Sequence, residues 1–514
     1  MADKLTIPHQ IFRAGERFAD SVAIRGEDGA EMRYRDLEPA VRKVAAAIVA
    51  ADVRAGDRVA IWAPNRPEWV VIAVALQAAG AVLVPLNTRL KGREAAHILG
   101  KSGARLLFTV GNYLGTDYRR LLDGQALPAL ARVVAIDEAS DWAAFVAGGD
   151  GHAAEVDRRL AGLGEDDLSD ILFTSGTTGL PKGAMTAHGQ NLRMFRTYAD
   201  KLGLREGDVY LVVNPFFHSF GYKAGWLSAL ISGATVLPHA TFDAASVLKR
   251  IEGEAVTVLP GPPTLYQSLL AAPWASHDLS SLRLAVTGAA SVPETLIYEM
   301  KNSLGFEVVL TAYGLTENCG VVTMCEAGDP ITVIANTAGR AIPGVEVKIV
   351  DETGATLGAG AAGELLVSGD GVMRGYFEDP VATARAVDAD GWLHTGDIAV
   401  ADAAGNIRIT DRRDDVFIVG GFNAYPAEIE GLLAAHPAIG QSAVVGVPDD
   451  RMGSVARAFI VLRPGHELDE AELVTWCRAN MANYKVPRQI SFVDALPQNA
   501  SGKVQKFLLR TDTA

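Results

Sequence analysis

The stretch Thr174–Gly183 reads TSGTTGLPKG and follows directly on the apolar run Ile171–Thr174. Its glycines let backbone N–H groups approach an anion closely, its hydroxyls can donate further hydrogen bonds, and Lys182 adds positive charge. The GxxxxGK[ST] spacing of a Walker loop is absent, and Pro181 precedes the lysine. The composition therefore predicts a phosphate-binding loop of another kind, with a surface loop rich in small residues as the plain alternative.

The chain on both sides of this stretch alternates short apolar runs with longer helical patterns, which is the rhythm of α/β architecture. Several of the apolar runs end in Gly- or Pro-rich turns, where α/β sheets usually present their ligand sites. The expected strands are Arg58–Trp62, Arg105–Val110, Ile171–Thr174, Tyr210–Val213, Thr257–Leu259, Leu282–Thr287 and Glu307–Leu310.

The apolar stretch Trp69–Val84 could be mistaken for a membrane helix. It contains Gln77 and Gly80, and it is shorter than the run of about 20 apolar residues that a membrane helix needs. We therefore expect a buried helix that ends near Gly80, followed by a buried strand.

The hydrophobic pattern changes from about Gly344 onward. Val345, Val347 and Ile349 alternate with polar residues, Asp351–Gly354 supplies turn residues, and Glu364–Val367 follows. This pattern predicts an antiparallel or barrel-like subdomain within the α/β chain.

A domain boundary is expected at the charged run Asp411–Asp415. We predict a large N-terminal domain over residues 1–411 and a small α/β domain over 412–514. In the second domain a helix is expected after Pro426, and strands are expected at Ala443–Val447 and Ala458–Leu462.

Composition narrows the class of protein. The formal net charge of −14 argues against a nucleic acid as partner. The cysteines are Cys319, Cys325 and Cys477, which form no CxxC pair, so neither a disulfide framework nor a structural zinc site is expected. The N-terminus lacks the apolar core of a signal peptide, and a cytoplasmic location without a transmembrane segment is expected. The sequence leaves the oligomeric state open, with a dimer as one option.

The string TSGTTGLPKG is similar to the signature of the acyl-adenylate-forming superfamily. That superfamily includes acyl-CoA synthetases, peptide-synthetase adenylation domains and beetle luciferases. Further strings resemble the other motifs of the superfamily, in the same order along nearly the whole chain. In chain order they are GAA at Gly288–Ala290, YGLTE at Tyr313–Glu317, GWLHTGD ending at Asp397, Arg412, GGF at Gly420–Phe422 and PQNASGK ending at Lys503.

The resemblance implies how ATP and Mg²⁺ are bound. Tyr313 would pack on adenine, Thr316 would touch the phosphate, and Glu317 would bind Mg²⁺. Asp397 would accept hydrogen bonds from the ribose hydroxyls, and Arg412 would reach ribose and phosphate. The full set of ATP-binding residues implied in this way is Thr174, Ser175, Gly176, Thr177, Thr178, Gly179, Leu180, Pro181, Lys182, Gly288, Ala289, Ala290, Thr311, Ala312, Tyr313, Gly314, Thr316, Asp397, Arg412 and Lys503.

The resemblance also assigns roles in the second domain. Lys503 would bridge carboxylate and phosphate oxygens during adenylation, Asp414 would be the hinge about which the small domain rotates, and Gly420–Phe422 would line the tunnel for coenzyme A. The expected catalytic residues are Lys503, Glu317, Thr174 and His218.

The acyl pocket is expected around the string NPFFHSFGYKAG. His218 lies where relatives place an aromatic gate, and it offers no fixed negative charge to pair with the ammonium of an amino acid. Lys223 is unusual in such apolar company; it could reach a carbonyl or a carboxylate of the acid, but it is expected to extend along the wall to solvent. The predicted pocket residues are Phe217, His218, Phe220, Gly221, Tyr222, Lys223 and Gly261.

The implied activity is an ATP-dependent acid–CoA ligase that forms AMP and pyrophosphate through an acyl-adenylate. The strings DILFTSGTTG, FGYKAG, VLPGPP and TLYQSLL are similar to those of actinobacterial FadD-type ligases that act on steroid-ring propionates. The alternatives are a medium-chain, alicyclic or aryl acid as substrate, a ligase that loads a carrier protein, a luciferase-like oxygenase, and a non-enzymatic binding protein.

Overall fold

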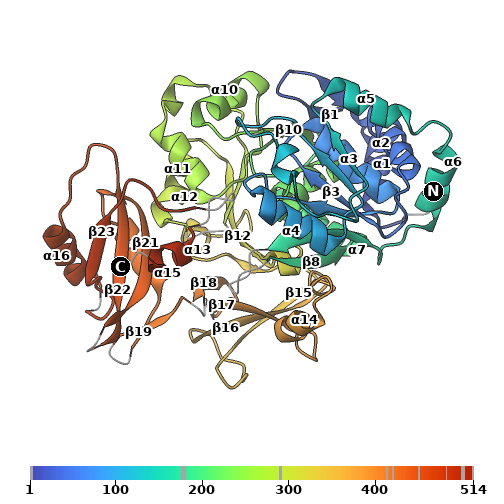
Figure 1. Cartoon of the computed structure of the whole chain (residues 1–514). Coiled ribbons are helices and arrows are strands. Elements are labelled where there is room, and N and C mark those ends of the chain that lie inside the picture. The colour runs from blue at the N-terminus through green and yellow to red at the C-terminus, as the bar shows by residue number, and fades with distance from the viewer. Residues whose placement is uncertain are drawn as a thin grey trace.

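The structure is a computed structural model that describes residues 4–174, 181–288, 292–412, 415–419, 422–449, 452–481, 483–498 and 504–511. It has the predicted mixed α/β class. Figure 1 shows a large N-terminal part and a smaller lobe that holds the C-terminal elements. The buried apolar residues follow the same division, because one cluster runs from Ile7 to Ile407 and two others lie between Phe417 and Leu509.

The phosphate-loop stretch belongs to a sheet with the strand order β6-β5-β3-β4-β7-β8. Its strands pair in parallel except for the antiparallel hairpin of β7 and β8. The residues between β7 and β8 are those of the predicted loop. The elements are α2 (Tyr34–Ala50), β3 (Arg58–Trp62), α3 (Pro67–Ala78), β4 (Val82–Pro85), α4 (Gly92–Ser102), β5 (Leu106–Thr109), η1 (Arg120–Leu122), β6 (Arg132–Ala135), α5 (Ala139–Ala147), α6 (Ala153–Gly162), β7 (Leu168–Thr174) and β8 (Lys182–Ala187).

The prediction for Trp69–Val84 is confirmed. Helix α3 is buried from Trp69 to Ala78, and Gly80 follows it in the left-handed region at φ 74° before strand β4 begins. A helix that is apolar on all sides must be buried on all sides, and here the surrounding elements of the N-terminal part bury it. Within the described part of the chain, no helix combines the length and the apolar character that a membrane crossing requires.

Two further sheets complete the α/β part, with the orders β2-β1-β10-β9 and β11-β12-β13-β14. The predicted strand Thr257–Leu259 is wrong as a full strand. Only Val258 pairs, with Tyr210 on one side and Leu284 on the other, and Pro260 then removes a backbone donor. The elements are α1 (Ile7–Arg17), β1 (Val22–Arg25), β2 (Glu31–Arg33), α7 (His188–Leu202), β9 (Val209–Val212), α8 (Ser219–Gly221), η2 (Tyr222–Leu227), α9 (Ser228–Ile231), β10 (Thr235–Pro238), α10 (Ala244–Glu254), α11 (Pro263–Ala271), η3 (Trp274–Ser276), β11 (Leu284–Gly288), α12 (Glu294–Asn302), β12 (Val308–Tyr313), η4 (Thr316–Asn318), β13 (Thr323–Met324), α13 (Ile331–Asn336) and β14 (Arg340–Ala341).

The predicted antiparallel subdomain is confirmed. Its sheet has the order β15-β16-β17-β18 with antiparallel pairing throughout, and β16 contains the predicted run Glu364–Val367. The elements are β15 (Val345–Val350), β16 (Ala362–Gly369), α14 (Pro380–Ala386), β17 (Leu393–Ala401) and β18 (Ile407–Arg412).

The C-terminal lobe is a small α/β unit with strands in the order β20-β19-β22-β21, and β23 pairs with β22. Helix α15 begins at Pro426, and β21 and β22 contain the two predicted strands, so these expectations are confirmed. The elements are β19 (Phe417–Val419), β20 (Phe422–Ala424), α15 (Pro426–Ala434), β21 (Ile439–Asp449), β22 (Gly453–Leu462), α16 (Glu470–Asn480), β23 (Gln489–Phe492) and α17 (Lys506–Thr511).

A charged pair lies inside the N-terminal core. The prediction that Lys223 extends to solvent is wrong, because its side chain is 0% exposed and its ammonium lies 3.0 Å from Asp170 Oδ1. Thr186 Oγ1 accepts from the same ammonium at 2.9 Å, while Asp170 Oδ2 accepts from Ser169 and Asn191. A buried charge must be paired, and this pair ties the π-helical turn η2 to the β7–β8 hairpin.

We expect Lys223→Met to lower the free energy of unfolding by about 3–5 kcal/mol, because it leaves the Asp170 carboxylate buried without its cation. The double variant Lys223→Met/Asp170→Asn should recover much of that loss, since the charge itself is removed. Urea unfolding followed by tryptophan fluorescence would measure both. As a control, loss of the exposed Arg158–Glu155 pair should change stability by no more than about 1 kcal/mol. A double variant less stable than Lys223→Met would contradict the expectation.

Candidate active site

The carboxylate of Glu317 lies beside the end of strand β7. Its Oε1 accepts a hydrogen bond from Thr174 Oγ1 at 3.1 Å, although the two residues are 143 positions apart. Thr174 is the last residue of β7 and lies opposite Lys182, the first residue of β8. Residues predicted from two separate motifs therefore meet at one point, where the phosphate-loop hairpin approaches the 3₁₀ turn η4.

A tyrosine outside the predicted site residues completes this cluster. The Tyr376 hydroxyl donates to the same Oε1 of Glu317 at 3.0 Å, and the Lys182 ammonium lies 5.3 Å from the centroid of the Tyr376 ring. Burial and the negative charge of Glu317 raise the pKa of Tyr376, which keeps its hydroxyl protonated as a donor. In the sequence, Tyr376 is a single aromatic residue in the connection after β16, and such a residue by itself predicts no role in binding or catalysis.

Tyr313 and Asp397 form a second cluster. Tyr313 ends strand β12, and its hydroxyl donates to Asp397 Oδ2. Asp397 lies on β17, only 7% exposed, and its backbone faces that of Arg412 on β18. Tyr313, predicted to contact adenine, and Asp397, predicted to contact ribose, are thus hydrogen-bonded to each other. The register of β17 and β18 places the backbone of Arg412 directly opposite Asp397.

The ends of β11 and β12 lie side by side. Gly288 faces Ala312, and a Cβ at Gly288 would lie 2.3 Å from the Ala312 carbonyl oxygen, so no larger residue fits here. The side chain of Thr311 is placed differently from what the ATP prediction implied. Its hydroxyl is buried and donates to the carbonyls of Ile334 and Thr337, and its own carbonyl accepts from Cys325 N–H, so these groups are occupied by protein partners.

The predicted gate residue caps a short helical turn. Phe217, His218 and Phe220 are half-buried. His218 Nδ1 accepts from the backbone N–H of Phe220 at 3.2 Å, which leaves Nε2 to carry the proton of a neutral ring. Gly221 permits the tight turn, because a Cβ there would lie 2.2 Å from the Pro215 carbonyl oxygen.

Other predicted pocket residues belong to the core instead. Tyr222 is fully buried, its ring stacks on Trp226 with centroids 4.9 Å apart, and its hydroxyl accepts from Gln77 at 3.0 Å. Lys223 is held by Asp170 as described above. The prediction that these two side chains face the acid is therefore wrong, because the turn after Gly221 directs both into the core. Gly261 is buried and donates its backbone N–H to Val286.

Several predicted residues lie outside the described part of the chain. They are Ser175, Gly176, Thr177, Thr178, Gly179, Leu180, Ala289, Ala290, Asp414, Gly420, Gly421 and Lys503. Arg412 and Phe422 are described by their backbone only. Pro181 precedes β8, Ala312 lies within β12, Gly314 follows β12, and Thr316 begins η4.

The donor set around Glu317 fits Mg²⁺. This ion is usually held by one or two carboxylates together with phosphate oxygens and water, and it needs no cage made entirely of protein. Glu317 supplies one such carboxylate at the end of the phosphate-loop hairpin, and among the described residues no group of three or more His, Cys, Asp or Glu side chains offers a protein cage.

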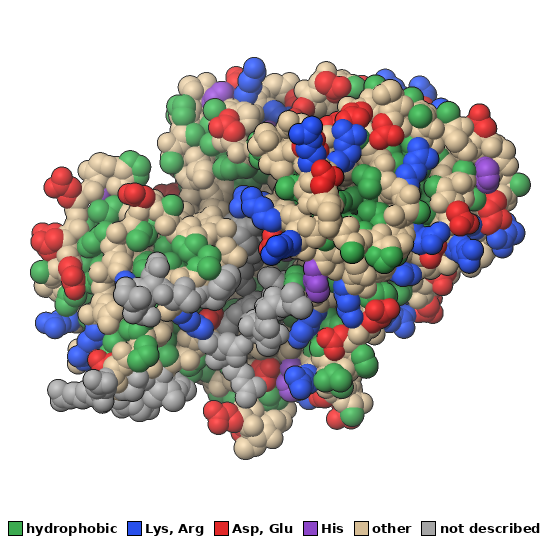
Figure 2. Space-filling view, viewed as in Figure 1, with side chains coloured by type: hydrophobic (Ala, Val, Ile, Leu, Met, Phe, Trp, Pro, Cys, Tyr) green, Lys and Arg blue, Asp and Glu red, His purple; other side chains and the backbone are tan. Residues whose placement is uncertain are grey.

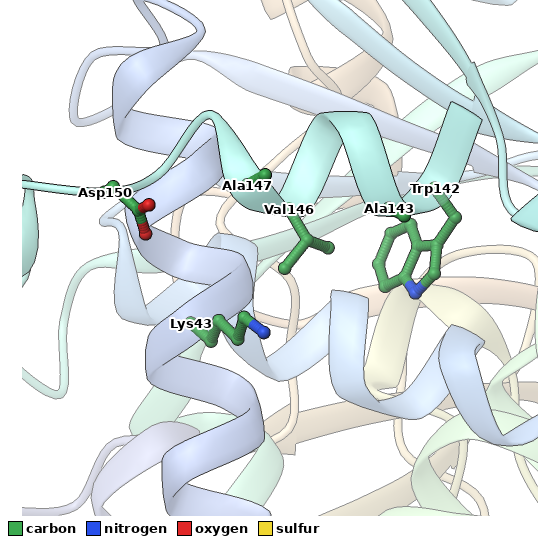
Figure 3. A pocket seen from close by; sticks show the side chains of 6 residues that line it. All are labelled: Lys43, Trp142, Ala143, Val146, Ala147 and Asp150. Atoms are coloured by element: carbon green, nitrogen blue, oxygen red, sulfur yellow. The ribbon is translucent and has the colours of Figure 1, made fainter. Parts of the chain in front are cut away.

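The surface in view carries mixed charge, and a hollow lies apart from both clusters. Figure 2 shows acidic and basic side chains interspersed over the face in view, without a large area of one sign. A hollow of about 370 Å³ lies between helices α2 and α5 (Figure 3). None of its lining residues belongs to either cluster. They are Lys43, Trp142, Ala143, Val146, Ala147 and Asp150.

Comparison with known proteins gives two family matches. Residues 11–377 match the AMP-binding enzyme family, and residues 428–503 match the AMP-binding enzyme C-terminal domain. The chain is 49% identical over 512 residues to a 3-[(3aS,4S,7aS)-7a-methyl-1,5-dioxo-octahydro-1H-inden-4-yl]propanoyl:CoA ligase of Mycobacterium tuberculosis, covering 99% of both chains. A ligase of the same name from Rhodococcus jostii is 46% identical over 519 residues, covering 99% of this chain and 98% of the relative.

Among solved structures, the anthranilate CoA ligase AuaEII in complex with anthranoyl-AMP superposes with a TM-score of 0.88. It is 29% identical, and the match covers 99% of this chain and 98% of that one. The family model spans more than half of the chain, and the full-length relatives agree with it. The chain therefore belongs to the AMP-binding enzyme family and is an AMP-forming acid–CoA ligase by its relatives and its fold.

Proposed function

We propose that this chain activates a propanoate carried on a fused two-ring diketone with ATP and transfers the acyl group to coenzyme A. The observation that carries the choice of acid is the 49% identity, over 99% of both chains, to a ligase named for such an acid. The half-buried Phe217 and Phe220 beside His218 give the expected acid an apolar and aromatic surface.

The first step must bring together two anions. A carboxylate oxygen attacks the α-phosphorus of ATP, the bond to the bridging oxygen breaks, and pyrophosphate leaves with that electron pair. The site must supply positive charge and oriented donors at this point. Lys182 and Thr174 supply a cation and a hydroxyl from the described residues, and Arg412 and Lys503 are assigned to the same task. When held by Glu317, Mg²⁺ would neutralise part of the triphosphate charge.

The second step transfers the acyl group. The thiol of coenzyme A loses its proton to solvent, its sulfur attacks the acyl carbonyl, and AMP leaves with the electron pair of the carbon–oxygen bond. We assign Gly420–Phe422 to the pantetheine tunnel and Asp414 to the hinge between the two steps. The separate cores of the two lobes support this assignment, because a rotation at the connection would leave both cores packed.

The acid can be tested directly. Purified protein with Mg·ATP should release pyrophosphate when given the dioxo-octahydroindenyl propanoate, and mass spectrometry should find its CoA thioester only when CoA is present. A medium-chain, an aryl and an amino acid form the comparison panel, and kcat/KM should be lower for each by at least about tenfold. Pyrophosphate release without a CoA thioester would favour a carrier protein as acceptor. No acid-dependent exchange of labelled pyrophosphate into ATP, with any acid, would overturn the proposed activity.

The two half-reactions should separate in two variants. Lys503→Ala should slow adenylation by about 10²–10³, the usual cost of one well-placed donor, while thioester formation from preformed acyl-adenylate is largely retained. Asp414→Pro should slow thioester formation more than adenylation, because proline restricts the backbone at the hinge. Each variant is the control for the other. Equal loss of both half-reactions in Lys503→Ala would show that its role is misassigned.

The ribose contact can be tested with a nucleotide analogue. Asp397→Ala should raise the KM for ATP by roughly 10–100-fold, the usual effect of losing hydrogen bonds to a charged group. The same variant should lose the preference of the wild type for ATP over 2′-deoxy-ATP. Tyr313→Phe removes the bond to Asp397 but keeps the ring, so its effect should be smaller. An unchanged preference in Asp397→Ala would contradict the assignment.

A further inference from the structure

The segment 370–377, between β16 and α14, lies along the outer side of strand β8. Phe377 N–H donates to the Gly183 carbonyl at 2.7 Å, and Met185 N–H donates to the Gly375 carbonyl at 3.0 Å. Tyr376 forms a bridge with Ala184 in the same register. The segment thus pairs with the open edge of the phosphate-loop hairpin through one bridge and its flanking backbone hydrogen bonds.

Three further bonds hold the segment at its start. Gln190 of α7 donates to the carbonyl oxygens of Asp370 and Val372, at 3.0 Å and 2.7 Å. Met373 N–H donates to the carbonyl of Glu317 at 2.8 Å. The backbone of Glu317 is therefore fixed by the same segment whose tyrosine contacts its carboxylate.

The side chain of Tyr376 joins two groups of opposite charge. Its hydroxyl donates to Glu317 Oε1 at 3.0 Å, and its ring lies 5.3 Å from the Lys182 ammonium. A cation near the face of a tyrosine ring is attracted to it, and a hydrogen bond to a carboxylate is stronger than one to a neutral acceptor.

Tyrosines that serve only packing behave differently in this chain. The hydroxyl of Tyr34 donates to the carbonyl oxygens of Leu230 and Ala234, and that of Tyr118 donates to the carbonyl of Thr88. These bonds satisfy buried hydroxyls with backbone acceptors. The bond of Tyr376 instead goes to a side chain assigned to the reaction.

We propose that Tyr376 is a positioning residue for the nucleotide, which orients the Glu317 carboxylate through its hydroxyl and the Lys182 ammonium through its ring. This inference rests on the proposed function, because the roles of Glu317 and Lys182 belong to it. The two contacts act on different parts of the ligand, since Glu317 would meet the metal and Lys182 the phosphates.

Binding experiments on two variants separate the contacts. Tyr376→Phe keeps the ring and removes the hydroxyl, so calorimetry should show Mg·ATP bound about 10-fold more weakly, with little change for ATP in EDTA. Tyr376→Leu removes the ring as well, and it should weaken ATP in EDTA by about 3-fold in addition. In the adenylation assay, the Mg²⁺ concentration for half-maximal rate should rise in Tyr376→Phe, while thioester formation from preformed acyl-adenylate stays unchanged.

Tyr34→Phe is the matched control, because it also removes a buried tyrosine hydroxyl but lies away from Glu317 and Lys182. It should leave both ATP affinities unchanged. A double-mutant cycle with Glu317→Gln supplies a second measurement. If Tyr376 acts through Glu317, Tyr376→Phe should cost little Mg·ATP affinity in the Glu317→Gln background, even if it also lowers the thermal midpoint.

Equal losses for Mg·ATP and metal-free ATP in Tyr376→Phe, or additive losses in the cycle, would overturn the proposal. Wild-type affinity for Mg·ATP in Tyr376→Phe would also overturn it. The calorimetric arms need no acid, so they report on Tyr376 even if no acid supports pyrophosphate exchange. Failure of the proposed function is therefore distinguishable from failure of this inference.

Discussion

The carboxylate of Glu317 is the point on which the arrangement of the site depends. It accepts hydrogen bonds from Thr174, at the end of the phosphate-loop hairpin, and from Tyr376, in the segment that pairs with that hairpin. A carboxylate with two donors on one oxygen has a defined orientation, which a metal ligand needs. Three segments distant in the chain thereby meet at one carboxylate, which is the geometry that the proposed binding of a triphosphate and its cation requires.

The support for this surface comes from inside the N-terminal core. The buried Lys223–Asp170 pair joins Asp170 on β7, four residues before Thr174, to Lys223 in the turn η2 that follows His218. Burying two charges is unfavourable unless their remaining hydrogen-bonding atoms are satisfied, and Thr186, Ser169 and Asn191 do this here. Strand β7 and the turn η2 are thus held in a fixed position relative to each other.

The division of the hydrophobic core has a different consequence. The apolar cluster of the N-terminal part contains Ile407, the first residue of β18, and the clusters of the C-terminal lobe begin at Phe417. Two lobes with separate cores can move relative to each other while each core stays packed. Such a division suits an enzyme whose two steps require different surfaces over the same nucleotide.

The sequence by itself determined the class of fold and the family. Alternating apolar runs predicted the strands, and the buried character of α3 was readable because a stretch of that length with Gly80 cannot span a membrane. Motif order along the chain predicted Thr174, Glu317, Tyr313 and Asp397, because these residues occur in strings with unusual composition. Each of these motifs consists of residues that are adjacent in the sequence, so it can be recognised without knowledge of the fold.

Only the tertiary structure decided which side chains meet. Tyr376 stands in a connection that carries no chemical signal of its own, and it reaches Glu317 because segment 370–377 pairs with β8. Tyr222 and Lys223 have the composition of a pocket wall, yet the turn after Gly221 directs both into the core, where Asp170 balances the lysine. The direction of a side chain after a turn, and the partner that compensates its charge, depend on residues distant in sequence, and the local pattern does not contain them.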